Sequence, residues 1–268
     1  MSFPYVVPLT PKEVITTGLN QICPLGTAGR TADGRSYRYA KNGTVAISKG
    51  LVAQGPVPTN PWDNATFSYL STAAGAVSIT STYSYIDINT TNTGSMTVAA
   101  NFFKEGYLWV SSSSTESGQM IKIKSHTASS SATAGQYARF TMDDGYRLSQ
   151  TIDSGSFVSV TKNLYDGVVV TPTALTGGVV GVPNCDVAAS TTAIPVYFWL
   201  QTWGPCPVKS GDAITIGMQV TTSTQVDGHV DSASGTTELQ VGNVVVGRTM
   251  GSGQTTSEFT LVHLTLEP

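Results

Sequence analysis

The feature that most constrains this fold is the apolar and aromatic run over residues 196–203, the densest in the chain. It reads Val-Tyr-Phe-Trp-Leu-Gln-Thr-Trp and ends at a Gly-Pro pair. β-Branched and aromatic side chains favour extended backbone, so we predict a strand that is buried at its start and half-exposed toward Trp203. Proline has no N–H to give to a ladder, so Pro205 and Pro207 predict a corner or a sheet edge at 204–207.

A second alternating segment follows at 213–220, after a Ser-Gly-Asp turn signal. We predict that it pairs with the aromatic run to form a central hairpin, against which the rest of the chain packs. Alternate side chains of a strand share one face, so Trp199, Gln201 and Trp203 should lie on the same side. That side is expected to become wet near the corner.

The rest of the chain reads as short alternating strands at intervals of ~8–12 residues. Asp33 and Gly34 predict a tight turn that leads into a strand at 35–39. The segment 259–266 is apolar on nearly both sides and predicts an interior strand that closes a domain. No stretch shows sustained helical periodicity. The expected fold class is therefore all-β, with β-sandwich or β-barrel modules and an extended N-terminal arm.

Proline and serine/threonine content divide the chain into parts. Residues 1–24 contain four prolines among apolar residues, which predicts an extended N-terminal arm that becomes ordered through another chain. Prolines at 55–61 mark a linker before the Ser/Thr-rich half. We predict that residues 59–164 form an inserted β-domain, and that 25–58 and 165–268 form a discontinuous main β-domain.

Exposed apolar side chains on such an arm would be a solubility liability for a lone chain, so they are expected to contact a neighbour or to fold back on the body. Trp203, at the half-exposed end of the aromatic run, is a further candidate. The predicted assembly and interface residues are Phe3, Tyr5, Val6, Val7, Leu9 and Trp203.

Charge and hydropathy exclude two classes of partner. Only 12% of residues are charged, the net charge is -3, and no run of three basic residues occurs. Binding to nucleic acid depends on such basic surface, so no nucleic-acid partner is expected. No apolar run approaches the ~20 residues of a membrane helix, and residues 1–5 lack the basic start of a signal peptide. We expect no membrane partner, and synthesis in a cytoplasm.

Catalytic signatures are weak. The three histidines, His126, His229 and His263, stand far apart, and no G-x-S-x-G nucleophile elbow occurs. The paired acids at 143–144 and the acids at 227–231 do not match the spacing of a calcium loop, so turn capping is the favoured role. The sequence predicts no catalytic residue, no metal site and no cofactor.

Cysteine usage is sparse. Cys23, Cys185 and Cys206 are widely spaced and odd in number, so they form no disulfide framework and no C-x-x-C metal motif. Burial as small apolar residues is their expected role, and their redox state stays open.

Six segments of the chain form an ordered set: GRTADGRSYRYAK (29–41), EGYLWV (105–110), GQMIKIKSH (118–126), YDGVVVTP (165–172), YFWLQTWGP (197–205) and LVHLTL (261–266). Together they resemble a family of virion structural proteins of tailed phages. The resemblance spans about residues 25–266 and is best at Tyr-x-Trp-Leu-Gln-Thr-Trp-Gly, followed by a strand and Gly-Asp. The 64–100 region matches little of the family, and the segment 112–117 replaces a Gly/Asp-rich loop.

The resemblance implies a capsid decoration (cement) protein on the capsid surface of the virion. It implies binding to the major capsid protein and self-association, with a homotrimer as the expected state. A rival hypothesis is a receptor-binding or fibre-type protein that recognises host surface glycans, favoured by the Ser/Thr/Tyr-rich region 64–100. An enzyme such as a depolymerase is a third. Long fibres usually show repeats or heptads, and the chain has neither, so the cement hypothesis is preferred.

Overall fold

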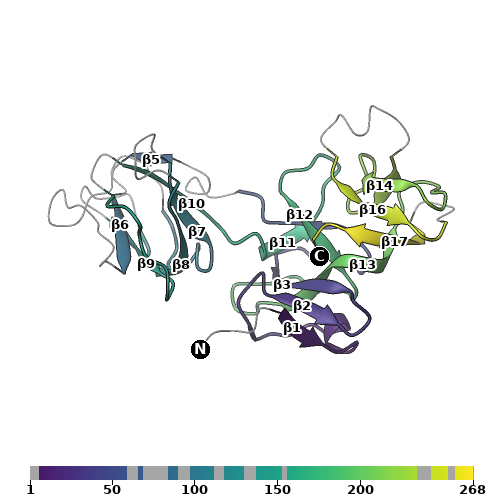
Figure 1. Cartoon of the computed structure of the whole chain (residues 1–268), viewed down its shortest axis with the longest axis horizontal. Coiled ribbons are helices and arrows are strands. Elements are labelled where there is room, and N and C mark those ends of the chain that lie inside the picture. The colour runs from purple at the N-terminus through teal and green to yellow at the C-terminus, as the bar shows by residue number, and fades with distance from the viewer. Residues whose placement is uncertain are drawn as a thin grey trace. The chain divides into compact units, whose positions relative to one another are not determined.

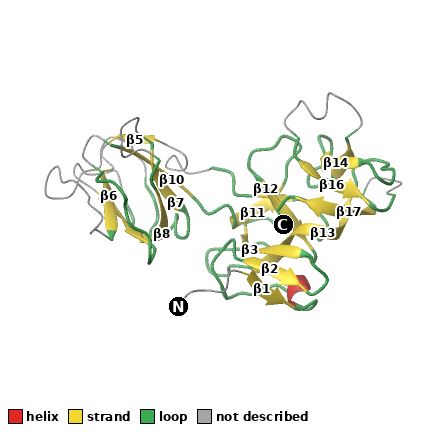
Figure 2. Cartoon of the chain, in the orientation of Figure 1, coloured by secondary structure: helices red, strands yellow, loops and turns green. Residues whose placement is uncertain are grey.

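The structure is a computed structural model of the full chain. It describes residues 6–58, 66–68, 84–89, 97–111, 118–129, 137–152, 156–233, 243–252 and 257–267. The all-β fold class is confirmed, and the one helix in the described ranges is the short 3-10 turn η1 (Glu13–Ile15), red in Figure 2. The chain divides into two compact units: unit 1 is Met1–Val57 with Leu164–Pro268, and unit 2 is Pro58–Asn163. These boundaries lie within one residue of the division expected from composition.

Unit 1 contains a closed five-stranded barrel within an eleven-stranded sheet (Figure 1). The spatial order is β1-β2-β3-β11-β4-β12-β13-β17-β16-β14-β15, and an additional pairing of β3 with β13 closes the ring β3-β11-β4-β12-β13. Closure removes free edges from those five strands. The strands are β1 (Val6–Leu9), β2 (Ala28–Thr31), β3 (Ser36–Asn42), β4 (Ala53–Gln54), β11 (Asp166–Val170), β12 (Val179–Pro183), β13 (Tyr197–Lys209), β14 (Gln219–Thr222), β15 (Val230–Ser232), β16 (Val245–Thr249) and β17 (Phe259–Thr265).

The aromatic run of β13 feeds two apolar clusters, one from each of its faces. Phe198 and Leu200 join a cluster with barrel residues such as Val168 and Val180. Trp199 points to the other face, where it packs with Tyr39 at 5.0 Å between ring centroids. Side chains alternate between the two faces of a strand. Consecutive apolar residues, such as Phe198 and Trp199, are therefore buried on opposite faces.

The predicted hairpin about a Gly-Pro corner is wrong, because β13 runs unbroken from Tyr197 to Lys209. The strand changes partner instead: it pairs with β3 up to Trp203 and with β17 from Trp203 onward. Gly204, at φ +87°, bends the strand at the point of exchange. The segment 213–220 supplies only the start of β14, which pairs with β15 and β16.

Two prolines fit inside β13 because of the direction in which their nitrogens face. Lys209 donates its backbone N–H away from β17, to the Gly50 carbonyl at 2.9 Å. Pro205 and Pro207 lie four and two residues before Lys209, so their backbone nitrogens face the same way as that of Lys209. They lie opposite His263 and Leu261 of β17, and their nitrogens face away from that strand. The prolines therefore interrupt no bond to β17, and at positions 205 and 207 the other edge of the strand has no backbone donor.

Two courses were expected for the apolar residues of the N-terminal segment, contact with a neighbour or folding back on the body, and the described residues follow the second. Residues 6–9 form β1, which pairs in parallel with β2. Leu9, Val14 and Cys23 are buried in the cluster that covers Trp199. Because a parallel pairing and a shared core tie it down, this segment is a layer over the barrel rather than an arm that another chain must order.

In its described residues, unit 2 is an antiparallel sheet of six strands in the order β5-β10-β7-β8-β9-β6. One face carries all the inward strand residues, such as Leu108, Ile121, Phe140 and Val158, in a single cluster completed by loop residues such as Phe103. The strand segments expected near 106–111, 119–124, 137–142 and 156–161 are confirmed, whereas the one expected at 76–80 lies outside the described residues. The strands are β5 (Thr66–Ser68), β6 (Tyr85–Asn89), β7 (Tyr107–Val110), β8 (Met120–His126), β9 (Tyr137–Met142) and β10 (Phe157–Thr161).

Candidate functional site

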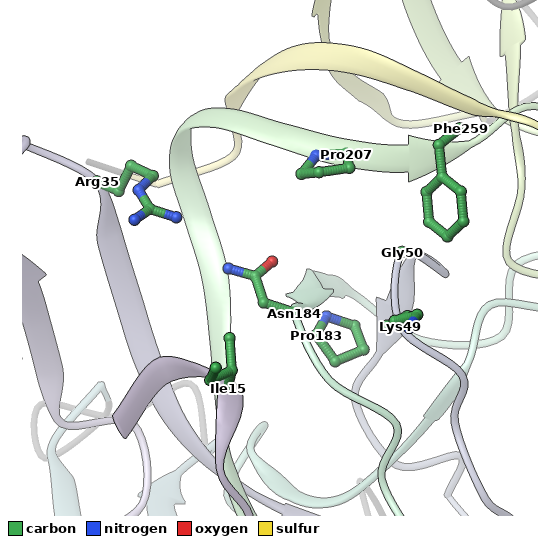
Figure 3. Close-up of a pocket in the computed structure, with 8 residues that line it drawn as sticks. All are labelled: Ile15, Arg35, Lys49, Gly50, Pro183, Asn184, Pro207 and Phe259. Atoms are coloured by element: carbon green, nitrogen blue, oxygen red, sulfur yellow. The ribbon is translucent and has the colours of Figure 1, made fainter. Parts of the chain in front are cut away.

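One candidate site in unit 1 is a cleft of about 250 Å³ beside the bend of β13 (Figure 3). Its walls come from η1, the β2–β3 turn, the loop before β4, the end of β12, and strands β13 and β17. Segments far apart in the sequence thus converge on one hollow. The lining residues are Ile15, Arg35, Lys49, Gly50, Pro183, Asn184, Pro207 and Phe259.

Gly50 shapes one wall of the cleft. Its N–H donates to the Pro183 carbonyl and its carbonyl accepts from Lys209, both at 2.9 Å, so it clamps the ends of β12 and β13 together. Its φ is +77°, a conformation that favours glycine. A Cβ at this position would lie 2.4 Å from Cε1 of Phe259, so a side chain would push that ring away.

Beneath the cleft lies a buried polar network centred on Asn184. Its side-chain nitrogen donates to Oε1 of Gln201 at 2.9 Å and to the Tyr37 hydroxyl at 3.2 Å, and its oxygen accepts from the Cys206 thiol at 3.4 Å. The Tyr37 hydroxyl in turn donates to Gln201 Oε1 at 3.4 Å. Asn184 is therefore committed to the framework, and it contributes no unsatisfied donor to the cleft.

Gln201 is fully buried, which corrects the expectation of a wet face near the corner. Its Nε2 faces the carbonyl oxygens of Trp203, Gly204 and Pro205 at 3.1, 3.3 and 2.8 Å. A bulge between Gln201 and Trp203 shifts the strand register there and turns these carbonyls toward the amide. The side chain thus satisfies the backbone at the bend, where a regular ladder cannot.

Cys206 and Tyr37 do not act as nucleophiles in this network. Burial raises the pKa of the Cys206 thiol to about 12, and burial also raises the pKa of the Tyr37 hydroxyl to about 12. Both groups therefore keep their protons near neutral pH, and a protonated thiol is a poor nucleophile. All three cysteines are free thiols; burial also raises the pKa of Cys185.

The polar character of the cleft itself comes from two cations. Arg35 donates from Nε to Asp33 at 2.8 Å, while its Nη groups make no hydrogen bond within the described part of the chain. The exposed Lys49 is held by its backbone N–H, which donates to Asp186 Oδ1 at 3.0 Å, and its ammonium makes no ion pair with a described residue. Four apolar side chains, Ile15, Pro183, Pro207 and Phe259, complete the lining.

His126, expected in a polar loop, ends strand β8 and is buried in the core of unit 2. Its Nε2 accepts from the Phe103 backbone N–H at 2.9 Å, and its Nδ1 donates to the Thr127 carbonyl at 2.9 Å. The ring stacks on Phe140 with 4.8 Å between centroids. Burial lowers the pKa of His126, which favours the neutral imidazole that this bonding pattern requires.

His229 and Ser257 form the arrangement closest to a catalytic dyad. Ser257 Oγ lies 3.4 Å from His229 Nε2, and Nδ1 of the same ring faces the backbone carbonyl of Asp227 at 2.9 Å. A triad places a carboxylate at Nδ1, where it stabilises the imidazolium that forms in the reaction. A peptide carbonyl stands in that position here, so the pair lacks that stabilisation.

Two of the remaining acids, Asp143 and Asp144, lie beside lysines, whereas Asp231 is only partly hydrogen-bonded. Asp144 pairs with Lys124 at 2.9 Å, and Asp143 lies 3.9 Å from Lys122. Thr221 and Asp231 face each other across strands β14 and β15, each with one buried oxygen that lacks a hydrogen-bond partner. In the described ranges, no group of three or more His, Cys, Asp or Glu side chains is arranged to hold a metal ion.

The predicted interface residues differ in their exposure. Val6 is exposed, Val7 is half-buried, and Leu9 is buried, so the first could meet a partner and the last could not. Trp203 is half-buried and packs edge-on against His263 at 5.5 Å between ring centroids. Phe3 and Tyr5 lie outside the described residues. The cleft itself was missed, because its lining residues come from separate segments that share no motif.

Within the described residues, no helix is long and apolar enough to span a membrane. No protein-family model matches the chain, and comparisons with curated proteins and with solved structures found no significant match.

Proposed function

We propose that this chain is a structural protein of a tailed-phage virion, a capsid decoration (cement) protein that stabilises the head by bridging capsid subunits. Its partners are the major capsid protein and further copies of itself, as a trimer, on the capsid surface. The proposal includes no catalytic activity, no cofactor and no contact with packaged DNA. The family resemblance of residues 25–266 supplies the class of protein.

Exposed apolar side chains on the two elements that flank the cleft carry this proposal. The N-terminal segment presents Ile15, Leu19 and Ile22, which are 56%, 59% and 68% exposed, and β17 presents Phe259 and Leu261. Large apolar residues exposed together on neighbouring elements are typical of surfaces that another protein covers. A decoration protein needs such surfaces, because its contacts of ~1,000–2,000 Å² are repeated by capsid symmetry.

The experiment compares phage particles with and without this protein. Particles that lack it should lose DNA more readily under heat, chelator and osmotic shock, and adding the purified protein back should restore their resistance. If stripped particles are as robust as intact ones but fail to adsorb to cells, the decoration proposal is wrong.

A receptor-binding role is the second candidate, and the outer face of the unit 2 sheet favours it. Trp109 lies there between Ser159 of β10 and Met120 of β8. Met120 and Phe157, on the same face, are well exposed. Aromatic side chains beside hydroxyl groups suit stacking against sugars as well as protein contacts. Loss of adsorption in a Trp109→Ala phage with stable heads would favour this role.

A further inference from the structure

None of the described residues that line the cleft beside β13 is Asp or Glu, so the lining offers no carboxylate to a cationic ligand. The amide of Asn184 is committed to Gln201, Tyr37 and Cys206. The donors that remain are the Nη groups of Arg35 and the ammonium of Lys49. Both are positively charged, so the polar part of any complementary ligand is an anion.

The apolar part of the lining favours a ligand whose anionic group is flanked by apolar groups. Phe259 and Ile15, which stand on opposite sides of the hollow in Figure 3, are 46% and 56% exposed. Pro183 and Pro207 lie between them. A free inorganic anion would leave these four side chains in water, whereas a peptide segment with one acidic residue between apolar residues would cover them.

The mode of binding follows from the edge of β13. A segment that joins a sheet as an extra strand needs backbone donors along the edge it meets. Pro205 and Pro207 supply none, and the Pro205 carbonyl already accepts from Gln201. The occupant is therefore held by its side chains, with the carboxylate toward Lys49 and apolar groups against Phe259 and Ile15.

We propose that this cleft docks an extended segment of a partner protein, with a single Asp or Glu flanked by apolar residues. The inference rests on the proposed function only in naming the partner, which would then be the major capsid protein. Burial of Phe259 and Ile15 gives affinity, and pairing of the carboxylate with Lys49 gives specificity and salt sensitivity.

The test that is independent of function is an NMR titration of the full chain. The probe is the blocked peptide Ac-Ala-Pro-Glu-Leu-Pro-Ala-NH2, and its matched control has Gln in place of Glu. The Glu peptide should shift the amide signals of Lys49, Gly50 and Asn184, and the Gln peptide should bind about tenfold more weakly. Inorganic phosphate should produce smaller shifts at the same signals.

Charge variants complete that test. Lys49→Glu should weaken the Glu peptide about tenfold or more, and Lys104→Glu, an equal charge change at an exposed site of unit 2, should leave its affinity unchanged. The proposal is overturned if the two peptides shift the cleft signals equally, if phosphate binds as well as the Glu peptide, or if neither peptide shifts them.

A second experiment measures co-sedimentation with undecorated phage heads and separates the two proposals. If the wild-type protein and Lys49→Glu bind heads equally, the cleft is not the contact, although the decoration function stands. If the wild-type protein fails to bind heads at all, the decoration function falls, and the peptide titration still decides the cleft.

Discussion

Unit 1 and unit 2 solve the same problem, how to bury apolar strands, in two different ways. Unit 1 closes a ring in which β13 serves three neighbours, β3, β12 and β17. In unit 2 the six described strands form a row that does not close into a ring, and every pairing is antiparallel. No described strand there pairs with more than two others. Its core lies against one face only.

The difference shows where each unit is vulnerable. In unit 1, one strand contributes side chains to the barrel interior, to the outer cluster around Trp199 and to the cluster shared with β17. Damage to β13 therefore reaches every part of that unit. In unit 2 the apolar core residues are spread over all the central strands. The imidazole of His126 is a polar group packed into that core, against Phe140.

The largest effect should follow truncation of the shared strand. Trp199, buried in unit 1, is expected to lose about 3–5 kcal/mol of unfolding free energy on replacement by Ala, because the change leaves a cavity. Hydrogen exchange measured by mass spectrometry should show the loss in unit 1 and unchanged protection in unit 2. Trp203→Ala, at a half-buried position, should lose clearly less; equal losses would argue against the gradient of burial along β13.

A somewhat smaller effect is expected at the polar centre of the same strand. Gln201→Leu keeps the side-chain volume but leaves Asn184, Tyr37 and the carbonyls of the bend without their partner. Unpaired buried groups should lower the unfolding free energy of unit 1 by about 2–3 kcal/mol. Chemical denaturation measures this. A neutral substitution would mean that water can replace the amide and that the bend does not depend on it.

The next effect is specific to unit 2 and depends on pH. Burial lowers the pKa of His126 below its ordinary value of 6.5, so the unfolded chain binds the proton more readily than the folded chain. The contribution of His126 to the unfolding free energy is fully present above about pH 6.5, and it is lost as the pH falls through the lowered pKa. Thermal melts between pH 7.5 and 5 should show unit 2 weakening.

The control for that prediction is His126→Gln, which cannot titrate. This variant should be less stable than the wild type at pH 7.5, because it loses ring packing on Phe140. Its melting temperature should nevertheless change less between pH 7.5 and 5. A pH response as steep as that of the wild type would assign the titration to another group.

The smallest effect is expected from removing unit 2 altogether. In unit 1, Gly55 and Leu164 are in contact, since a Cβ at Gly55 would lie 2.5 Å from Leu164 Cδ1. Strands β4 and β11, just beyond them, are antiparallel neighbours. Replacing residues 58–163 by a short Gly/Ser linker should leave the unfolding free energy of unit 1 unchanged within about 0.5 kcal/mol. Loss of cooperative unfolding would show that the barrel depends on its insert.

Local alternation predicted much of the fold, whereas the pairing of distant segments did not follow from it. The Asp33–Gly34 turn and strands such as β8 and β17 carry their signals within a few residues. Whether Pro205 and Pro207 remove a hydrogen bond from the sheet depends on the direction in which their nitrogens face. That direction matters only relative to β17, which lies more than fifty residues later in the chain. The parallel pairing of β1 was hidden for the same reason, because its partner lies across a long connection.

The candidate site was harder to predict than the fold. Arg35 and Lys49 are separated by strand β3 and the loop that follows it, and they match no motif. Strict alternation placed Gln201 beside Trp203, on the face that was expected to be solvated. The bulge that buries Gln201 is visible only in the register with β3. A hollow assembled from separate segments carries no signal in any one of them.

The insertion of unit 2 also sets an order of events during synthesis. Strands β1 to β4 leave the ribosome first, but the barrel partners of β3 and β4 follow only after unit 2 has been made. At ~5–20 residues per second, the roughly hundred residues of unit 2 take on the order of 5–20 s. Throughout that interval the nascent N-terminal strands have no barrel to join, so unit 2 can fold while unit 1 is still incomplete.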